Sequence, residues 1–178
     1  MKLTADADSV LRVQRYDGSP SIDGVEFTEL RRFNDDGGAM TELLRFEEDR
    51  PAGLEGFEPR QLNYSILQPG AIKAFHLHRR QTDVWFVPPE DRILMVLVDV
   101  RAGSPSAAVR QRFMLGDGTS RFVRVPPGVA HGCRNIGAEE ARILYLTDLV
   151  FDPDPEQCDE GRLPWDFAGA EIWDVVKE

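Results

Sequence analysis

Short runs of alternating apolar and polar residues, separated by turns rich in glycine and proline, dominate this chain from residue 61 onward. In the first run, 61–66, the side chains of Gln61, Asn63 and Ser65 fall on one face of a strand, and apolar side chains fall on the other. Many short strands at this spacing are typical of an all-β sandwich or barrel, of which the jelly roll is one common form. We therefore predict an all-β chain.

The other predicted strands are rich in β-branched residues and end at glycine or proline. They cover residues 25–30, 41–46, 71–78, 84–87, 93–100, 109–115, 122–125 and 143–150. The Asp-Asp-Gly-Gly stretch at 35–38 predicts a turn, and residues 47–57 predict a mobile loop, because charges there surround one proline and two glycines. Helical spacing is confined to 168–176, where we expect a short helix.

The length of 178 residues fits one domain with a well-developed core. Within this single domain we expect N-terminal strands and a loop at 1–60, the barrel core at 61–151 and a C-terminal extension at 152–178. A hydrophobic share of 42% and a charged share of 29% are typical of globular proteins and argue against a disordered chain.

The charge balance narrows the choice of partner. Twenty-one basic and 31 acidic residues give a net charge of −10, which repels nucleic acid and anionic membranes at long range. We therefore expect no nucleic-acid and no membrane partner. An anionic small molecule can still bind where arginine or lysine side chains line a pocket.

Cysteine usage and hydropathy predict the compartment. No apolar run approaches the ~20 residues of a membrane helix, and the first residues lack the apolar core of a secretory signal. With only Cys133 and Cys158 in the chain, a disulfide framework is not expected. We predict two buried thiols in a cytoplasmic protein.

All three histidines lie in two short segments, 70–83 and 126–135. Strand alternation places His76 and His78 on one face and Lys73 on the other. A lone histidine is more commonly a satisfied core or surface residue. Because the whole set is confined to two such segments, we expect the three histidines to share one interior pocket.

These two segments resemble the paired motifs of the cupin superfamily. The first has Gly70, five residues, His-x-His, four further residues and then Asp83, where the superfamily usually carries glutamate. The second matches Pro-x-Gly-x-x-His-x-x-x-Asn and contains His131. The resemblance implies a double-stranded β-helix, the cupin jelly-roll barrel, with these residues converging inside it.

The wider sequence resembles one branch of cupins, the dTDP-4-dehydrorhamnose 3,5-epimerases. Gln61-x-Asn63-x-Ser65 followed by Gly70 and His76 keeps the order of that family's substrate-binding strand and catalytic histidine. The stretch 99–105 matches its Asp-x-Arg-x-Gly-Ser-Pro, 126–132 matches its Pro-x-Gly-x-Ala-His-Gly, and Tyr145 stands at its catalytic tyrosine. The resemblance spans roughly residues 25 to 173.

The resemblance implies an isomerase that acts on a nucleotide-linked 4-keto-6-deoxysugar without a cofactor. His76 would take a proton next to the ketone, Tyr145 would return one from the opposite face, and His131 would support the pocket. A histidine suits the first role because its pKa lies near working pH. Family members are usually homodimers, which implies the same for this chain.

The resemblance also implies where the substrate is held. Gln61 and Asn63 would contact the nucleotide-sugar, and Arg60 or Lys73 would neutralise its diphosphate.

The chain departs from the family at three places. The lysine that follows the family's histidine is missing from 81–84, where Asp83 would instead repel a developing oxyanion. We expect the acid that the family pairs with its histidine to fall beyond residue 178, and Phe151 occupies a further tyrosine position.

These departures leave two alternatives open. The first is a metal-dependent cupin, such as a sugar isomerase or small dioxygenase, which binds Zn²⁺, Fe²⁺, Mn²⁺ or Ni²⁺ through imidazoles and one carboxylate. Its ligands would be His76, His78, Asp83 and His131. The second is a non-catalytic sugar-binding cupin.

Overall fold

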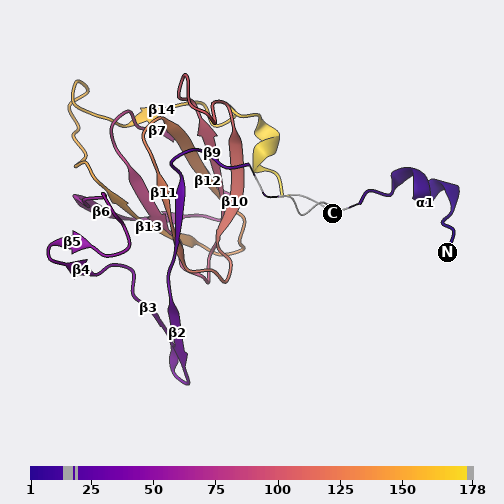
Figure 1. Cartoon of the computed structure of the whole chain (residues 1–178), viewed down its shortest axis with the longest axis horizontal. Helices are drawn as coiled ribbons and strands as arrows, with labels where there is room; N and C mark the ends of the chain where they lie inside the picture. The colour runs from indigo at the N-terminus through magenta and orange to yellow at the C-terminus, as the bar shows by residue number, and fades with distance from the viewer. Residues whose placement is uncertain (14–17, 19, 176–178) are drawn as a thin grey trace.

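The computed structural model describes residues 1–13, 18 and 20–175, and two five-stranded antiparallel sheets dominate it (Figure 1). The β6 sheet has the order β1 (Glu26–Glu29), β11 (Arg121–Val125), β8 (Asp83–Phe86), β13 (Ala141–Thr147) and β6 (Gln61–Leu67). The β7 sheet has the order β10 (Arg110–Gly116), β9 (Arg92–Asp99), β12 (Val129–Asn135), β7 (Ile72–Leu77) and β14 (Gly161–Arg162). The all-β prediction is confirmed.

The main core lies between the two sheets, and the β7 sheet is also covered on its outer face. Strand β9 shows why: Met95 and Leu97 point into the core between the sheets, whereas Leu94 and Val96 pack outside against the C-terminal segment. That segment carries the 3₁₀ helix η1 (Ala170–Trp173). The β7 sheet is therefore apolar on both faces, which secures the strands that carry the histidines.

The N-terminal part differs most from the prediction. Strand β3 (Gly38–Thr41) pairs with β2 (Arg32–Asp35) around the predicted turn, and this hairpin projects from the sheets (Figure 1). The strand predicted at 41–46 is wrong, because 42–45 pairs with no strand in the described residues and only the short β4 (Phe46–Glu47) and β5 (Arg50–Pro51) follow.

Three further elements differ from expectation. Helix α1 (Ala5–Val10), capped by the Thr4 hydroxyl, was not predicted. Strand β12 (Val129–Asn135) was not predicted as a strand, although its residues belong to the second histidine motif. Its polar residues interrupt the alternation of apolar and polar side chains. The helix predicted at 168–176 is the shorter η1, and residue 176 lies outside the described residues.

A bulge in β7 changes which side chains face the interior. His76 pairs with His131, and Lys73 pairs with Cys133. Between these two pairs, β7 contains one more residue than β12. Because one extra residue reverses the alternation, Lys73 faces the same side as His76, and its predicted placement on the opposite face is wrong. Gly132 permits the bulge, since a side chain there would collide with Ala74.

Candidate functional site

A cavity of about 340 Å³ lies between the sheets and is lined by polar side chains from both of them. Lys73 and His76 come from β7, whereas Ser65, Asp83 and Tyr145 come from strands of the β6 sheet. The structure brings the three histidines together: the His76 and His131 rings are stacked at 5.8 Å, and the His78 and His131 rings lie 5.5 Å apart. His76 and His78 line the cavity, whereas His131 lies buried beside it.

His76 is held by a carboxylate that the sequence analysis missed. Its Nδ1 lies 2.9 Å from Glu160 Oε1, so Nδ1–H donates to the carboxylate and Nε2 keeps a free lone pair. Glu160 directly precedes strand β14, which pairs with β7 so that Arg162 lies opposite His76. This pairing places the carboxylate beside the histidine. The expectation that the histidine's acidic partner lies beyond residue 178 is therefore wrong.

Burial and neighbouring charges set the protonation of this pair. Burial lowers the pKa of His76 because it disfavours the imidazolium, and the Glu160 carboxylate partly opposes that effect. The hydrogen bond from His76 holds the pKa of Glu160 at about 2, and Arg162, at 2.8 Å, also favours the charged form. The result is a neutral imidazole backed by a permanently charged carboxylate near neutral pH.

Tyr145 reaches the same cavity from strand β13 of the opposite sheet. Its ring lies 5.6 Å from that of Trp85 and is half-buried. Burial raises the pKa of Tyr145, and the carboxylates of Glu160 and Asp83 raise it further. The phenol therefore carries its proton at neutral pH and can donate it.

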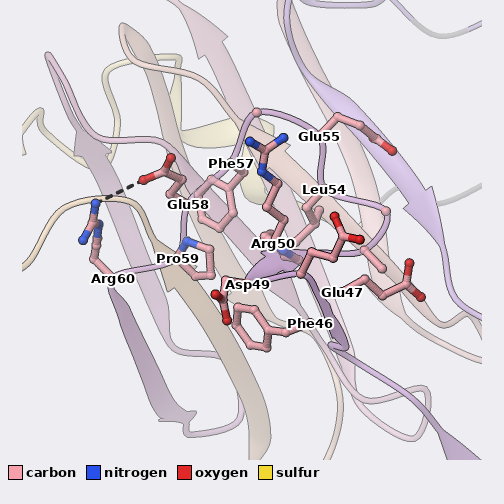
Figure 2. A pocket seen from close by; sticks show the side chains of 15 residues that line it. Phe46, Glu47, Asp49, Arg50, Leu54, Glu55, Phe57, Glu58, Pro59 and Arg60 are labelled. Atoms are coloured by element: carbon pink, nitrogen blue, oxygen red, sulfur yellow. Dashed lines mark hydrogen bonds and ion pairs between the residues drawn. The ribbon is translucent and has the colours of Figure 1, made fainter.

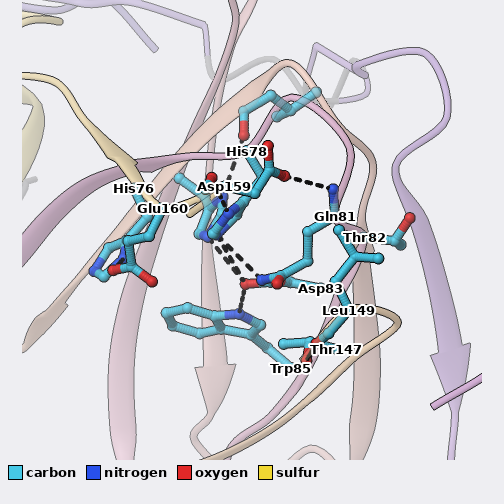
Figure 3. A network of polar contacts seen from close by, with 12 residues as sticks. His76, His78, Gln81, Thr82, Asp83, Trp85, Thr147, Leu149, Asp159 and Glu160 are labelled. Atoms are coloured by element: carbon cyan, nitrogen blue, oxygen red, sulfur yellow. Dashed lines mark hydrogen bonds and ion pairs between the residues drawn. The ribbon is translucent and has the colours of Figure 1, made fainter. Parts of the chain in front are cut away.

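A second group of side chains, the buried cluster His78, Asp83 and His131, lies beside the first. Asp83 Oδ2 is 3.2 Å from His131 Nε2 and 3.8 Å from His78 Nε2, and it accepts a hydrogen bond from Trp85 Nε1 at 3.1 Å (Figure 3). Burial opposes the charge on Asp83, but the two imidazoles and the indole hold its pKa at about 2. All three members are less than 5% exposed.

Backbone carbonyls set the orientation of both imidazoles in the buried cluster. His78 Nδ1 donates to the carbonyl of Asp159 at 3.0 Å, and His131 Nδ1 donates to the carbonyl of Val129 at 3.1 Å. Both Nε2 atoms are therefore turned toward Asp83. Within the described part of the chain, His131 Nε2 has no well-aligned hydrogen-bond partner. His76 is not part of this convergence, since its Nδ1 faces Glu160.

Comparison of the sequence and the fold with known proteins points to one family. Residues 19–166 match the family profile described as dTDP-4-dehydrorhamnose 3,5-epimerase. The chain belongs to that family. It is therefore an isomerase of the carbohydrate-epimerase type, and its sheets form the cupin jelly roll.

Individual relatives of the epimerase family align over most of the chain. The spore coat polysaccharide biosynthesis protein SpsL of Bacillus subtilis is 39% identical over 145 residues, which cover 82% of this chain and 91% of SpsL. A dTDP sugar isomerase structure from Desulfovibrio desulfuricans G20 superposes with a TM-score of 0.71 at 26% identity, covering 83% of this chain and 88% of that one. The epimerase RmlC of Legionella pneumophila, solved in complex with dTDP-4-keto-L-rhamnose, has a TM-score of 0.64 at 26% identity and covers 76% and 72%.

Three further residues singled out by the epimerase resemblance, Gln61, Asn63 and Phe151, lie in an adjoining cavity of about 270 Å³. Gln61 and Asn63 line it and are hydrogen-bonded to each other at 2.8 Å. Phe151 also lines it, and its backbone N–H donates to Gln61 Oε1 at 2.9 Å. Because Tyr145 and Glu160 border both cavities, the two form one continuous site.

Arg60 is the one predicted substrate residue that the structure does not bring to this site. It lines a hollow of about 860 Å³ formed by consecutive residues 46–60 alone, where it pairs with Glu58 at 3.1 Å (Figure 2). This hollow shares no residue with the histidine cavity.

The two cysteines differ from the prediction in one respect. Cys133 is buried, and burial raises the pKa of its thiol to about 12. Cys158 is partly exposed, so its predicted burial is wrong; it lies in the irregular segment before β14 rather than in a sheet. Among the described residues, no helix has the length and apolar character needed to cross a membrane.

Proposed function

We propose that this chain inverts a carbon next to the ketone of a nucleotide-linked 4-keto-6-deoxysugar, with His76 as the base and Tyr145 as the acid. The observation that carries the proposal is their placement on opposite sheets around one cavity. Inversion needs a proton to leave from one face of the sugar ring and another to arrive from the other face. A base and an acid across a cavity meet that requirement.

Each step uses groups already described. His76 Nε2 accepts the C–H proton, and the electron pair of that bond moves toward the ketone, whose oxygen becomes an enolate. Glu160 stabilises the imidazolium so formed, because its carboxylate lies 2.9 Å from Nδ1. Tyr145 then donates its phenolic proton to carbon from the opposite side, and water returns a proton from His76 to the phenolate.

The proposed substrate is a dTDP-sugar, in keeping with the ligand of the Legionella relative. The histidine cavity would hold the sugar ring, and the adjoining cavity would hold polar parts of the nucleotide against Gln61 and Asn63. Arg80 borders that second cavity and is 62% exposed, which leaves it accessible to a phosphate. No cofactor takes part in this chemistry.

The test is deuterium incorporation from D₂O into dTDP-4-keto-6-deoxyglucose, followed by mass spectrometry and NMR. We expect exchange at C3, at C5 or at both, and its loss in His76→Gln. If the wild-type protein exchanges neither position with or without added metal, the proposal fails. Binding of dTDP without any exchange would then favour the non-catalytic sugar-binding alternative.

A second candidate function, metal-dependent cupin chemistry, is favoured by the buried cluster. Zinc ligands at about 2.0–2.2 Å from the ion stand about 3–4 Å apart, and the ligand atoms of His78, Asp83 and His131 all lie within 4.8 Å of one another. Nδ1–H groups bound to carbonyls are the usual support of metal-binding histidines. The set fits Zn²⁺, Fe²⁺, Mn²⁺ or Ni²⁺, and such an ion would polarise a carbonyl oxygen.

Metal analysis separates the two candidates. Under the first, protein purified without chelator carries no stoichiometric transition metal, and chelation leaves exchange unchanged. One equivalent of metal, lost in His78→Ala together with exchange, would replace the metal-free mechanism. His76→Gln should keep the metal in that case, because His76 is not one of the three convergent ligands.

We further propose that the chain acts as a homodimer. Leu62, Tyr64 and Ile66 form an exposed apolar row on the outer face of β6, at 63%, 60% and 44% exposure. Contiguous apolar surface of this kind is typical of an interface. Sedimentation should give a dimer that Leu62→Asp weakens; a wild-type monomer at tens of micromolar would refute it.

We also propose that the chain works in the cytoplasm, where thiols stay reduced. Cys133 and Cys158 are both free thiols, which supports a reducing compartment. Fractionation of the source cells tests this, and recovery of the protein outside the cytoplasmic fraction would contradict it.

A further inference from the structure

Asp159 fastens the C-terminal segment to the bend that follows β7. Its carboxylate accepts hydrogen bonds from three successive backbone N–H groups, that of Arg79 at 3.3 Å and those of Arg80 and Gln81 at 2.9 Å. Successive N–H groups of this kind form a concave anion site, and their bonds to a carboxylate are stronger than bonds between neutral groups. Because the Asp159 side chain is only 10% exposed, water competes little for these bonds.

The same short stretch of chain orients both histidines of the first motif. The carbonyl oxygen of Asp159 accepts a hydrogen bond from His78 Nδ1 at 3.0 Å. The next residue, Glu160, accepts one from His76 Nδ1 at 2.9 Å. Figure 3 shows Asp159 beside His78 and Glu160 beside His76. Asp159 therefore lies at the point where the segment meets both imidazoles.

Few other contacts hold this segment on either side of Glu160. After Glu160, strand β14 pairs with β7 over two exposed residues, and Leu163 exchanges two backbone hydrogen bonds with β7 at 3.0 and 3.1 Å. Before Glu160, Arg80 donates to the carbonyl of Gln157 at 2.9 Å, but the Arg80 side chain is 62% exposed. The buried carboxylate of Asp159 is therefore the stronger anchor before Glu160.

We propose that Asp159 is a positioning residue that fixes the tautomer of His76 by holding Glu160 against it. In a neutral imidazole one nitrogen carries the proton and the other accepts, and the hydrogen bond made by one nitrogen decides the state of the other. With Glu160 in place, the proton lies on Nδ1 and Nε2 keeps its lone pair. The catalytic consequence rests on the proposed function, whereas the tautomer itself does not.

Loss of the Asp159 carboxylate removes the anchor directly before Glu160. Glu160 can then move away from His76 Nδ1, and the Nε2–H tautomer, which free histidine favours in water, becomes populated. In that tautomer Nε2 carries a proton and cannot accept another one from the sugar, so the base is in the wrong state for its role. A carboxylate that does not touch the substrate thus controls the nitrogen that does.

NMR of the histidine rings tests the tautomer directly, because the chain contains three histidines. In protein labelled with ¹⁵N-histidine at neutral pH, the nitrogen shifts report each tautomer, and the spectrum of His76→Gln assigns His76. We expect the Nδ1–H tautomer in wild type and a substantial Nε2–H population in Asp159→Ala. Asp159→Asn should lie between them, because its Oδ1 still accepts hydrogen bonds.

The matched control is Asp35→Ala. The Asp35 carboxylate also accepts a hydrogen bond from a backbone N–H, that of Gly37 at 2.8 Å, but it lies in the exposed β2–β3 hairpin. This variant should keep the His76 tautomer of the wild type. It therefore separates the loss of any backbone-binding carboxylate from the loss of this one.

Turnover then shows whether Asp159 acts through Glu160. Asp159→Ala should lower kcat for deuterium exchange into dTDP-4-keto-6-deoxyglucose about 10- to 100-fold, the range for partners that orient metal-bound histidines. Its KM should stay within about threefold of wild type. In a Glu160→Ala background the same change should lower kcat by less than about threefold, because the group that Asp159 positions is already gone.

The outcomes separate this inference from the proposed function. If Asp159→Ala keeps the Nδ1–H tautomer of His76, the inference is wrong even if its Tm falls. A defect confined to KM, or an undiminished loss of kcat on top of Glu160→Ala, would also overturn it, since Asp159 would then act by another route. If wild type exchanges no protons, the proposed function fails, and the tautomer in Asp159→Ala still decides the positioning role. Should Asp159→Ala not fold, Asp159→Asn is judged by the same criteria.

Discussion

His76 and His78 lie two residues apart, yet their surroundings differ in the feature that matters for chemistry. His76 is held through Nδ1 by a carboxylate, Glu160, and is about one-fifth exposed to the cavity. His78 is held through Nδ1 by a backbone carbonyl and is buried, with Nε2 turned toward Asp83. A charged partner stabilises an imidazolium, whereas a carbonyl partner mainly orients the ring. The first arrangement suits a base, and the second suits a structural group or metal ligand.

The largest expected difference between these two sites is in turnover. His76→Gln removes the base and should lower deuterium exchange about 10³-fold, within the range for loss of a general base. His78→Gln, the matched change, should leave exchange within about tenfold. Equal losses in both variants would break the comparison and favour a site in which all the histidines act together.

The next-largest effect on turnover is expected at Glu160, the carboxylate that accepts the hydrogen bond from His76 Nδ1. Glu160→Gln should lower kcat about 10²-fold, because an amide orients the ring without stabilising the imidazolium. Glu160 raises the pKa of His76 and Arg162 lowers it, so the acid limb of the kcat/KM profile should move to lower pH in Glu160→Gln and to higher pH in Arg162→Met. Profiles that coincide with wild type would remove Glu160 from the mechanism.

The buried cluster should contribute more to stability than the cavity-facing pair. Asp83 has its pKa lowered from 3.8 to about 2, so its charge stabilises the folded state above about pH 4, and that contribution is lost as pH falls through 2. Asp83→Asn should lower the free energy of unfolding by about 2 kcal/mol at neutral pH. Arg92→Met, at an exposed pair, should change it by less than about 0.5 kcal/mol. Denaturant titration at pH 7 and pH 3 measures both, and the Asp83→Asn deficit should shrink at the lower pH.

The smallest effect is expected at Arg60, which shares the loop hollow with Glu58. Arg60→Met should change KM less than about threefold, because the side chain is exposed and outside both cavities. A tenfold rise in KM would show that the 46–60 loop reaches the substrate and would extend the site beyond the sheets.

Much of the fold and part of the site could be predicted from the sequence, since strict alternation along β6 and the paired histidine motifs reflect local strand geometry. The placement of Lys73 could not, because a one-residue bulge reverses side-chain direction and is set by the pairing of β7 with β12. Glu160 was missed for a related reason: a two-residue strand, β14, joins β7 across 84 residues of sequence. Both errors arise from long-range pairing that periodicity does not encode.

The central claim, that His76 and Tyr145 act on opposite faces of one sugar, is tested most directly by Tyr145→Phe. The substrate is dTDP-4-keto-6-deoxyglucose in D₂O, with exchange and configuration at C3 and C5 followed by NMR. We predict that the variant still exchanges protons through His76 but returns deuterium to the original face, so that inversion is lost while exchange persists. Inversion at the wild-type rate in Tyr145→Phe would contradict the claim.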